Sequence, residues 1–71
     1  MSDYFAWSPL RDLMEEAGAE IVARDAVDKL MDYLERYAKD LTDCALDVTR
    51  HSGRKKVTAG DIKIAIDLIN E

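Results

Sequence analysis

The sequence predicts an all-α fold of three helices, short, long and short, in which the long helix requires a second chain to cover it. Apolar residues recur at helical spacing along most of the chain, and one proline and three glycines divide it into three segments. The chain has only 71 residues. Because a chain of about 60 residues buries only about 60% of its unfolded surface, its stability is marginal without help, which usually comes from a disulfide, a metal or a partner chain.

The first helix is expected over residues 9–17. Ser8 and Pro9 open it, because serine is a good N-cap and proline is tolerated at the first helical position. Gly18 follows, in a position to end the helix in a left-handed conformation. The helix carries a short amphipathic stripe made by Leu10, Leu13, Met14 and Ala17.

The second helix is expected from Arg24 or Asp25 to about His51, a segment without proline or glycine. Its apolar residues keep a helical period: Ala26, Val27, Leu30, Met31, Leu34, Tyr37, Ala38, Leu41, Cys44, Ala45 and Val48. At 1.5 Å per residue such a helix is roughly 40 Å long, longer than a folded monomer of this size is wide. Its ends therefore overhang a monomeric core, and we expect a second copy to cross it.

The third helix is expected after the basic turn that follows Ser52 and Gly53. Thr58, with Asp61 three residues later, resembles a capping box at its start. Its buried face is marked by Ile62, Ala65, Ile66 and Ile69. No linker divides the chain, so we expect a single domain over residues 1–71.

Composition and charge exclude several classes of function. The chain has 15 acidic and 10 basic side chains, a net charge of -5 and one cysteine and one histidine, Cys44 and His51. These two residues form neither an intrachain disulfide nor a zinc-binding pattern, so we predict no metal, no cofactor, no small-molecule substrate and no enzymatic activity. No segment has the pattern of a signal peptide or a membrane span, which predicts a cytoplasmic protein without membrane association.

Three segments resemble the archaeal histones, which have the minimal, tail-less histone fold. They are EAGAE at 16–20, TRHSGRK at 49–55 and VTAGDI at 57–62, and the similarity extends without a gap from about residue 5 to residue 69. The resemblance implies a histone fold whose long helices cross in a handshake dimer. It also implies that a β-favouring fragment in the first loop of one protomer lies beside one in the second loop of the other.

The resemblance implies roles for individual residues. Arg54 pairs with Asp61 and braces the second loop, the alternative being a solvent-exposed ion pair of little energy. His51 contacts Asp61 across two dimers in a tetramer, the alternative being only a favourable cation at a helix C-terminus. Gly18 allows neighbouring dimers to stack, the alternative being a simple C-cap. The expected dimer and tetramer interfaces contain Leu30, Leu34, Tyr37, Leu41, Val48, His51, Asp61 and Ile62.

The resemblance also implies double-stranded DNA as a partner, bound through its phosphates. The second-loop contacts are expected from Arg54, Lys55, Lys56 and Thr58. The first-helix contacts are eroded, because residues 1–20 hold five acidic side chains against Arg11 alone, and Ile21 occupies the position of the family's minor-groove arginine. Arg11 and Arg24 lie close to these eroded positions and are expected as secondary contacts.

Two functions follow from this distribution of charge. The first is a nucleoid-associated histone that forms a homodimer, or a tetramer, and compacts DNA without sequence specificity and with weakened affinity. The alternative is an acidic variant that pairs with a paralogous histone or caps an array, or a histone-fold interaction module with little direct DNA binding.

Overall fold

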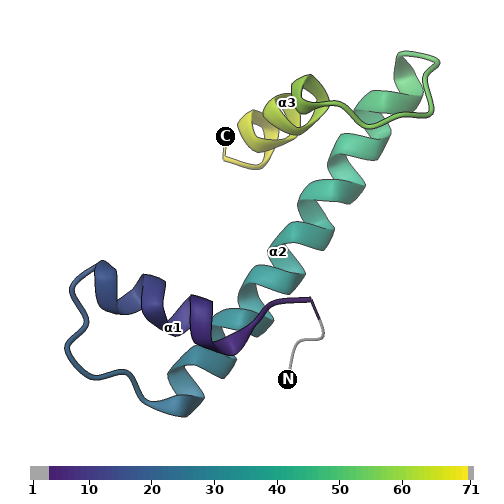
Figure 1. The fold of residues 1–71 in the computed structure, drawn as a ribbon. Helices are drawn as coiled ribbons and strands as arrows, with labels where there is room; N and C mark the ends of the chain where they lie inside the picture. The colour runs from purple at the N-terminus through teal and green to yellow at the C-terminus, as the bar shows by residue number, and fades with distance from the viewer. Residues whose placement is uncertain (1–3, 71) are drawn as a thin grey trace. The chain divides into compact units, whose positions relative to one another are not determined.

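The computed structural model describes residues 4–70 of the chain. Three helices are formed: α1 over Trp7–Glu16, α2 over Arg24–His51 and α3 over Ala59–Ile69 (Figure 1). The described residues contain no strand, so the predicted order of a short, a long and a short helix is confirmed. None of these helices is long and apolar enough to cross a membrane. Residues 1–3 and 71, the ends of the predicted domain, lie outside the described part.

The start of α1 differs from the prediction, because the helix begins at Trp7 and its N-cap is Ala6 rather than Ser8. No side chain caps this end. The first i to i−4 hydrogen bond runs from the Leu10 N–H to the Ala6 carbonyl, at 3.4 Å. Pro9 is the third helical residue, and its missing N–H is one of those that every helix start leaves unpaired. Proline is thus tolerated at several first-turn positions. The predicted N-cap at Ser8 is therefore wrong.

The helix ends follow the glycine prediction. Gly18 and Gly53 have φ angles of 117° and 73°, in the left-handed region that favours glycine. After α1, the N–H of Ala19 donates to the carbonyl of Met14 at 3.2 Å, the wider hydrogen bond of a Schellman motif. At the end of α2, the N–H of Arg54 makes the equivalent bond to the carbonyl of Thr49. These hydrogen bonds therefore fix the backbone where each loop leaves its helix.

The chain forms two compact units, residues 1–36 and 37–71. In the first unit, α1 packs against the first part of α2 through a small apolar core of Leu10, Val27 and Met31. Partly buried residues complete this core: Trp7, Met14, Val22, Leu30 and Leu34.

The second unit is centred on small and polar side chains. Ala45 on α2 and Ala65 on α3 are fully buried, and Thr49 and Asp61 are buried as well. Larger apolar residues of this unit, such as Ile62, are only half-buried. A polar pair therefore lies at the buried centre of this unit, whereas the buried centre of the first unit is apolar.

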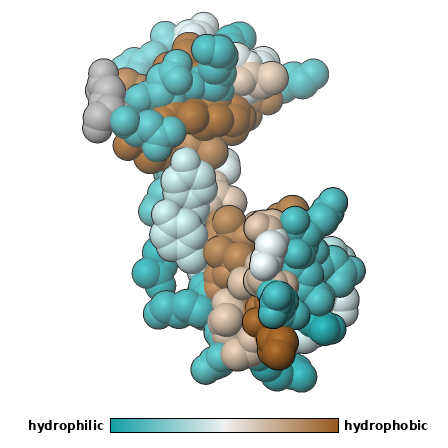
Figure 2. All heavy atoms as spheres, turned by 90° about the vertical axis from the view of Figure 1, so that its left-hand side faces the viewer, coloured by the Kyte–Doolittle hydropathy of each residue, from teal (hydrophilic) through white to brown (hydrophobic). Residues whose placement is uncertain are grey.

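Large apolar side chains remain exposed in both units, and Figure 2 shows hydrophobic residues on the surface of each. Leu13 is 60% exposed and Ile21 93% exposed. On α3 the exposed apolar residues are Ile64, Ile66, Leu68 and Ile69. The predicted interface residues that are only half-buried are Leu30, Leu34, Tyr37, Leu41, Val48 and Ile62. A single chain thus leaves much of its apolar surface uncovered.

Truncation of Met31 to alanine is expected to lower the free energy of unfolding by about 2–5 kcal/mol per protomer, because Met31 is the largest fully buried side chain of the first core. Urea denaturation followed by circular dichroism measures this loss. Lys29→Ala, at an exposed position on the same helix, is the control. Equal stabilities of the two variants would contradict the assigned core.

Candidate nucleic-acid interface

The loop between α2 and α3 is fixed at both ends by hydrogen bonds to the main chain. Arg54 begins it, and its N–H donates to the carbonyl of Thr49 at 3.2 Å. Thr58 ends it as the N-cap of α3: its hydroxyl accepts from the Asp61 N–H at 3.3 Å, and its own N–H donates to Asp61 Oδ2 at 3.0 Å. The capping box expected from the sequence is therefore present.

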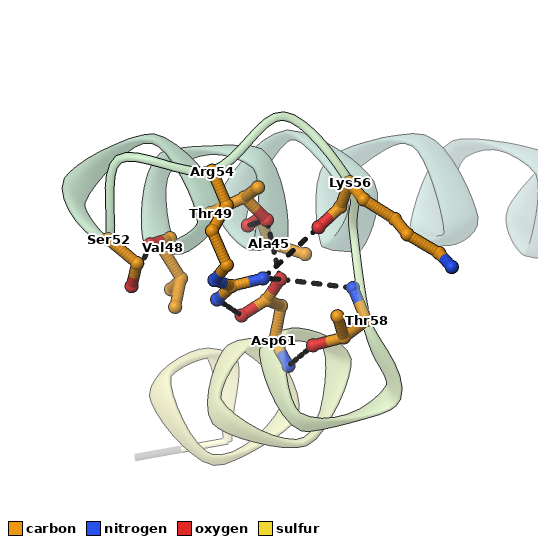
Figure 3. A network of polar contacts seen from close by, with 8 residues as sticks. All are labelled: Ala45, Val48, Thr49, Ser52, Arg54, Lys56, Thr58 and Asp61. Carbon is orange, nitrogen blue, oxygen red and sulfur yellow. Dashed lines mark hydrogen bonds and ion pairs between the residues drawn. The ribbon is translucent and has the colours of Figure 1, made fainter.

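The carboxylate of Asp61 joins the loop to both helices (Figure 3). Arg54 donates from Nη2 to Oδ1 at 2.7 Å and from Nη1 to Oδ2 at 3.1 Å, a bidentate pair. The hydroxyl of Thr49 donates to Oδ2 at 2.7 Å. Asp61 is only 2% exposed, so the pair differs from the solvent-exposed alternative. This geometry suits a brace, because removing a donor leaves a buried acceptor with fewer partners.

The same contacts set the ionisation of the pair. The hydrogen bond from Arg54, followed by those from Thr49 and the Thr58 N–H, holds the pKa of the Asp61 carboxyl well below its usual range. The hydrogen bond to Asp61 raises the pKa of Arg54. Both groups are therefore charged at neutral pH, and the Arg54 guanidinium is directed towards the Asp61 carboxylate.

The two lysines of this loop are differently placed. Lys55 and Lys56 are exposed, and in the described part of the chain neither forms an ion pair. Only the carbonyl of Lys56 joins the network, accepting from Arg54 Nη1 at 3.1 Å, while its side chain leads away from Asp61 (Figure 3). Of the three basic residues predicted as phosphate contacts, the lysines are available, whereas Arg54 is held by its partners.

Arg11 and Arg24, the predicted secondary contacts, lie in the first unit around one aromatic ring. The guanidinium carbon of each is 5.6 Å from the centre of the Trp7 ring. Arg11 also approaches Glu15, with 3.5 Å between Nε and Oε1. Sequence reasoning missed this use of Trp7. The spacing of four residues predicts that Trp7 and Arg11 lie on the same face of α1, whereas no pattern in the sequence predicts the contact with Arg24.

His51 and Gly18, the residues predicted for tetramer formation and stacking, both lie at helix ends. His51 is exposed at the last residue of α2, and Asp61, its expected partner across dimers, is buried within its own protomer. Space is open around Gly18, but its φ of 117° disfavours a side chain, which agrees with a C-cap. Among residues 4–70 no cluster of three or more His, Cys, Asp or Glu side chains could hold a metal ion.

Asp61→Asn is expected to lower stability at neutral pH and to flatten its dependence on acid. Because the folded pKa of Asp61 lies below its unfolded value of about 3.9, its contribution is complete well above pH 4 and declines as the pH falls towards the folded pKa. Urea denaturation at pH 7 and pH 3 measures both effects.

The control for this substitution is Asp67→Asn, an exposed acid on α3 whose nearest basic nitrogen, Lys63 Nζ, lies 3.8 Å from its carboxylate. Its acid dependence should match that of the unmodified protein. If the Asp61 variant loses as much stability between pH 7 and pH 3 as the unmodified protein does, the buried brace is refuted.

Comparison with known proteins agrees with the helix order and with the loop. Residues 7–66 match the family described as histone-like transcription factor (CBF/NF-Y) and archaeal histone. The chain is also 42% identical over 59 residues to one of the subunits of archaeal histone HAN1 from Thermococcus zilligii, an alignment that covers 83% of this chain and 88% of the relative.

Proteins of this family are chromosome-associated DNA-binding proteins with structural rather than enzymatic roles, and dimerisation is typical of them. The match covers all of α1 and α2 and most of α3. The chain therefore belongs to the histone-fold family that comprises CBF/NF-Y-like transcription factors and the archaeal histones.

Proposed function

We propose that this protein is an archaeal-type histone of the nucleoid that forms a handshake homodimer and compacts double-stranded DNA without sequence specificity. The observation that carries this proposal is the braced loop with Lys55 and Lys56 exposed and without carboxylate partners in the described residues. Lysine contacts with phosphate oxygens supply affinity but read no base sequence. A dimer brings two such loops to one duplex.

The exposed apolar surface supports dimerisation. Leu13 on α1 and Leu68 on α3 are at least half exposed in the single chain, and the apolar line of α2 is only half-buried. Exposed apolar residues on this scale mark an interaction surface. A second copy that crosses α2 would cover them and would place the two loops of one protomer beside those of the other.

The first unit supports a weakened affinity. Ile21 is 93% exposed in the first loop, where it offers phosphate no charge. The acidic side chains of residues 1–20 repel phosphate, and one of them, Glu15, also engages Arg11. Each phosphate that the protein does not neutralise lowers the slope of log affinity against log salt by about 0.9. We therefore expect a lower affinity and a shallower salt dependence than a basic first helix would give.

A second function is favoured by the same acidic segment. In that case the chain pairs with a basic paralogous histone and limits, rather than extends, the compaction of DNA. The relative from Thermococcus zilligii is named as a lettered subunit of its histone, which supports pairing with a second kind of chain. The exposed apolar surface fits either partner.

Lys55→Gln and Lys56→Gln are each expected to weaken binding to a labelled duplex and to reduce the salt slope by about 0.9 for each phosphate that is no longer neutralised. Fluorescence anisotropy across a salt series measures both quantities. Lys39→Gln, at an exposed position on α2, should leave them unchanged. No binding of the unmodified protein at about 50 mM salt, where phosphate contacts are strong, would exclude direct DNA binding.

Native mass spectrometry distinguishes the partners. The proposed homodimer has twice the 8.0 kDa mass of one chain, and His51→Ala should abolish any tetramer while leaving the dimer. Mixing with a basic archaeal histone provides the comparison. Complete conversion into mixed dimers would favour the acidic variant, whereas persistence of the homodimer supports the first proposal.

A further inference from the structure

We propose that Trp7 is a positioning residue that holds Arg11 and Arg24 together as one phosphate-binding pair in the first unit. This inference rests on the proposed function, which supplies the phosphates of duplex DNA. The ring of Trp7 thereby keeps two positive charges available to a polyanion within a strongly acidic segment.

The ring of Trp7 links the beginnings of two helices. Trp7 is the first residue of α1, Arg11 lies one helical turn later, and Arg24 is the first residue of α2. Each guanidinium carbon is 5.6 Å from the ring centre, so the two carbons are separated by no more than twice that distance. Contacts at this distance are cation–π interactions. They hold two positive charges at one ring although the charges repel each other.

The ring itself is held by the core of the first unit. Trp7 packs against the buried cluster of Leu10, Val27 and Met31, so it is a fixed surface rather than a mobile one. Arginine side chains that are already ordered on such a surface lose less conformational entropy when they bind a ligand. Their planar guanidinium groups also match the oxygens of a phosphate.

The positive charge of Arg24 does not stabilise the helix that it begins. A cation at the first residue of α2 meets the positive end of the helix dipole. Asp25 follows it, but in the described residues no carboxylate lies within ion-pair distance of Arg24. A positive charge without an acidic partner, beside helix N–H groups that favour anions, is available to an incoming phosphate.

Arg11 forms only a weak ion pair within its own chain. Its pair with Glu15 engages Nε at 3.5 Å, and both side chains are partly exposed. Surface pairs of this kind contribute little to stability. The terminal nitrogens of Arg11, which carry all but one of the guanidinium donors, therefore remain able to bind phosphate.

The test compares two arginines of the same helix. Arg24→Gln should lower the salt slope of duplex binding by about 0.9 for each phosphate released, whereas Arg36→Gln, an equal change of charge at an exposed position away from the ring, should not. Trp7→Leu retains every charge but should weaken binding about two- to fivefold for each arginine freed from the ring, and Trp7→Phe, which keeps an aromatic face, should restore most of it.

Two further measurements separate positioning from a structural role. Trp7 is the sole tryptophan, so its emission should change when duplex DNA is added to the unmodified protein and should change less when DNA is added to Arg24→Gln, in which only Arg11 remains at the ring. A melting curve for each variant sets a temperature at which it is folded. If Trp7→Leu does not fold, Trp7 emission in the unmodified protein and in Arg24→Gln still tests the role of the ring, and equal salt slopes of the two arginine variants still overturn it.

Equal salt slopes for Arg24→Gln and Arg36→Gln would overturn the inference. If Lys55→Gln and Lys56→Gln weaken binding at the same time, the proposed function stands and only the role of Trp7 falls. If the unmodified protein binds no duplex at all, both fall together.

Discussion

The buried carboxylate of Asp61 is the group on which the loop, the start of α3 and the end of α2 all depend. It accepts hydrogen bonds from Arg54, Thr49 and the N–H of Thr58, and the fully buried apolar side chains among the described residues of this unit are two alanines. The geometry of the loop therefore depends on one ionised group and its donors. The exposed lysines beside Arg54 are thereby presented from a fixed backbone rather than from a mobile loop.

In each unit a neighbouring residue fixes arginine side chains, and the two neighbours affect the arginine charge differently. Asp61 neutralises much of the charge of Arg54 and directs its donors towards the carboxylate, so Arg54 shapes the loop while the two lysines remain exposed. Trp7 holds Arg11 and Arg24 without neutralising either charge. In an acidic segment, an aromatic support keeps positive charge available where a carboxylate support would consume it. Each unit thus offers positive charge in its own way, the second from a loop built by an ion pair and the first from two arginines held on a ring.

The parts of the fold that depend on local sequence were predictable, and those that depend on distant contacts were not. The bounds of α2 follow from an uninterrupted apolar period that ends before Gly53. The start of α1 was misplaced because a proline near a helix start does not identify which residue of the first turn it occupies. The burial of Thr49 against Asp61 and the contact between Trp7 and Arg24 join residues 12 and 17 positions apart, and no local pattern in the sequence marks either pair.

The salt dependence of duplex binding by the unmodified protein tests the central claim most directly. If a dimer neutralises phosphates with Lys55 and Lys56 of both protomers, a plot of log affinity against log salt should fall with a slope of about −3.6, approaching about −7 when Arg11 and Arg24 contribute fully. A slope near zero, or no detectable affinity at low salt, would contradict phosphate binding by this histone.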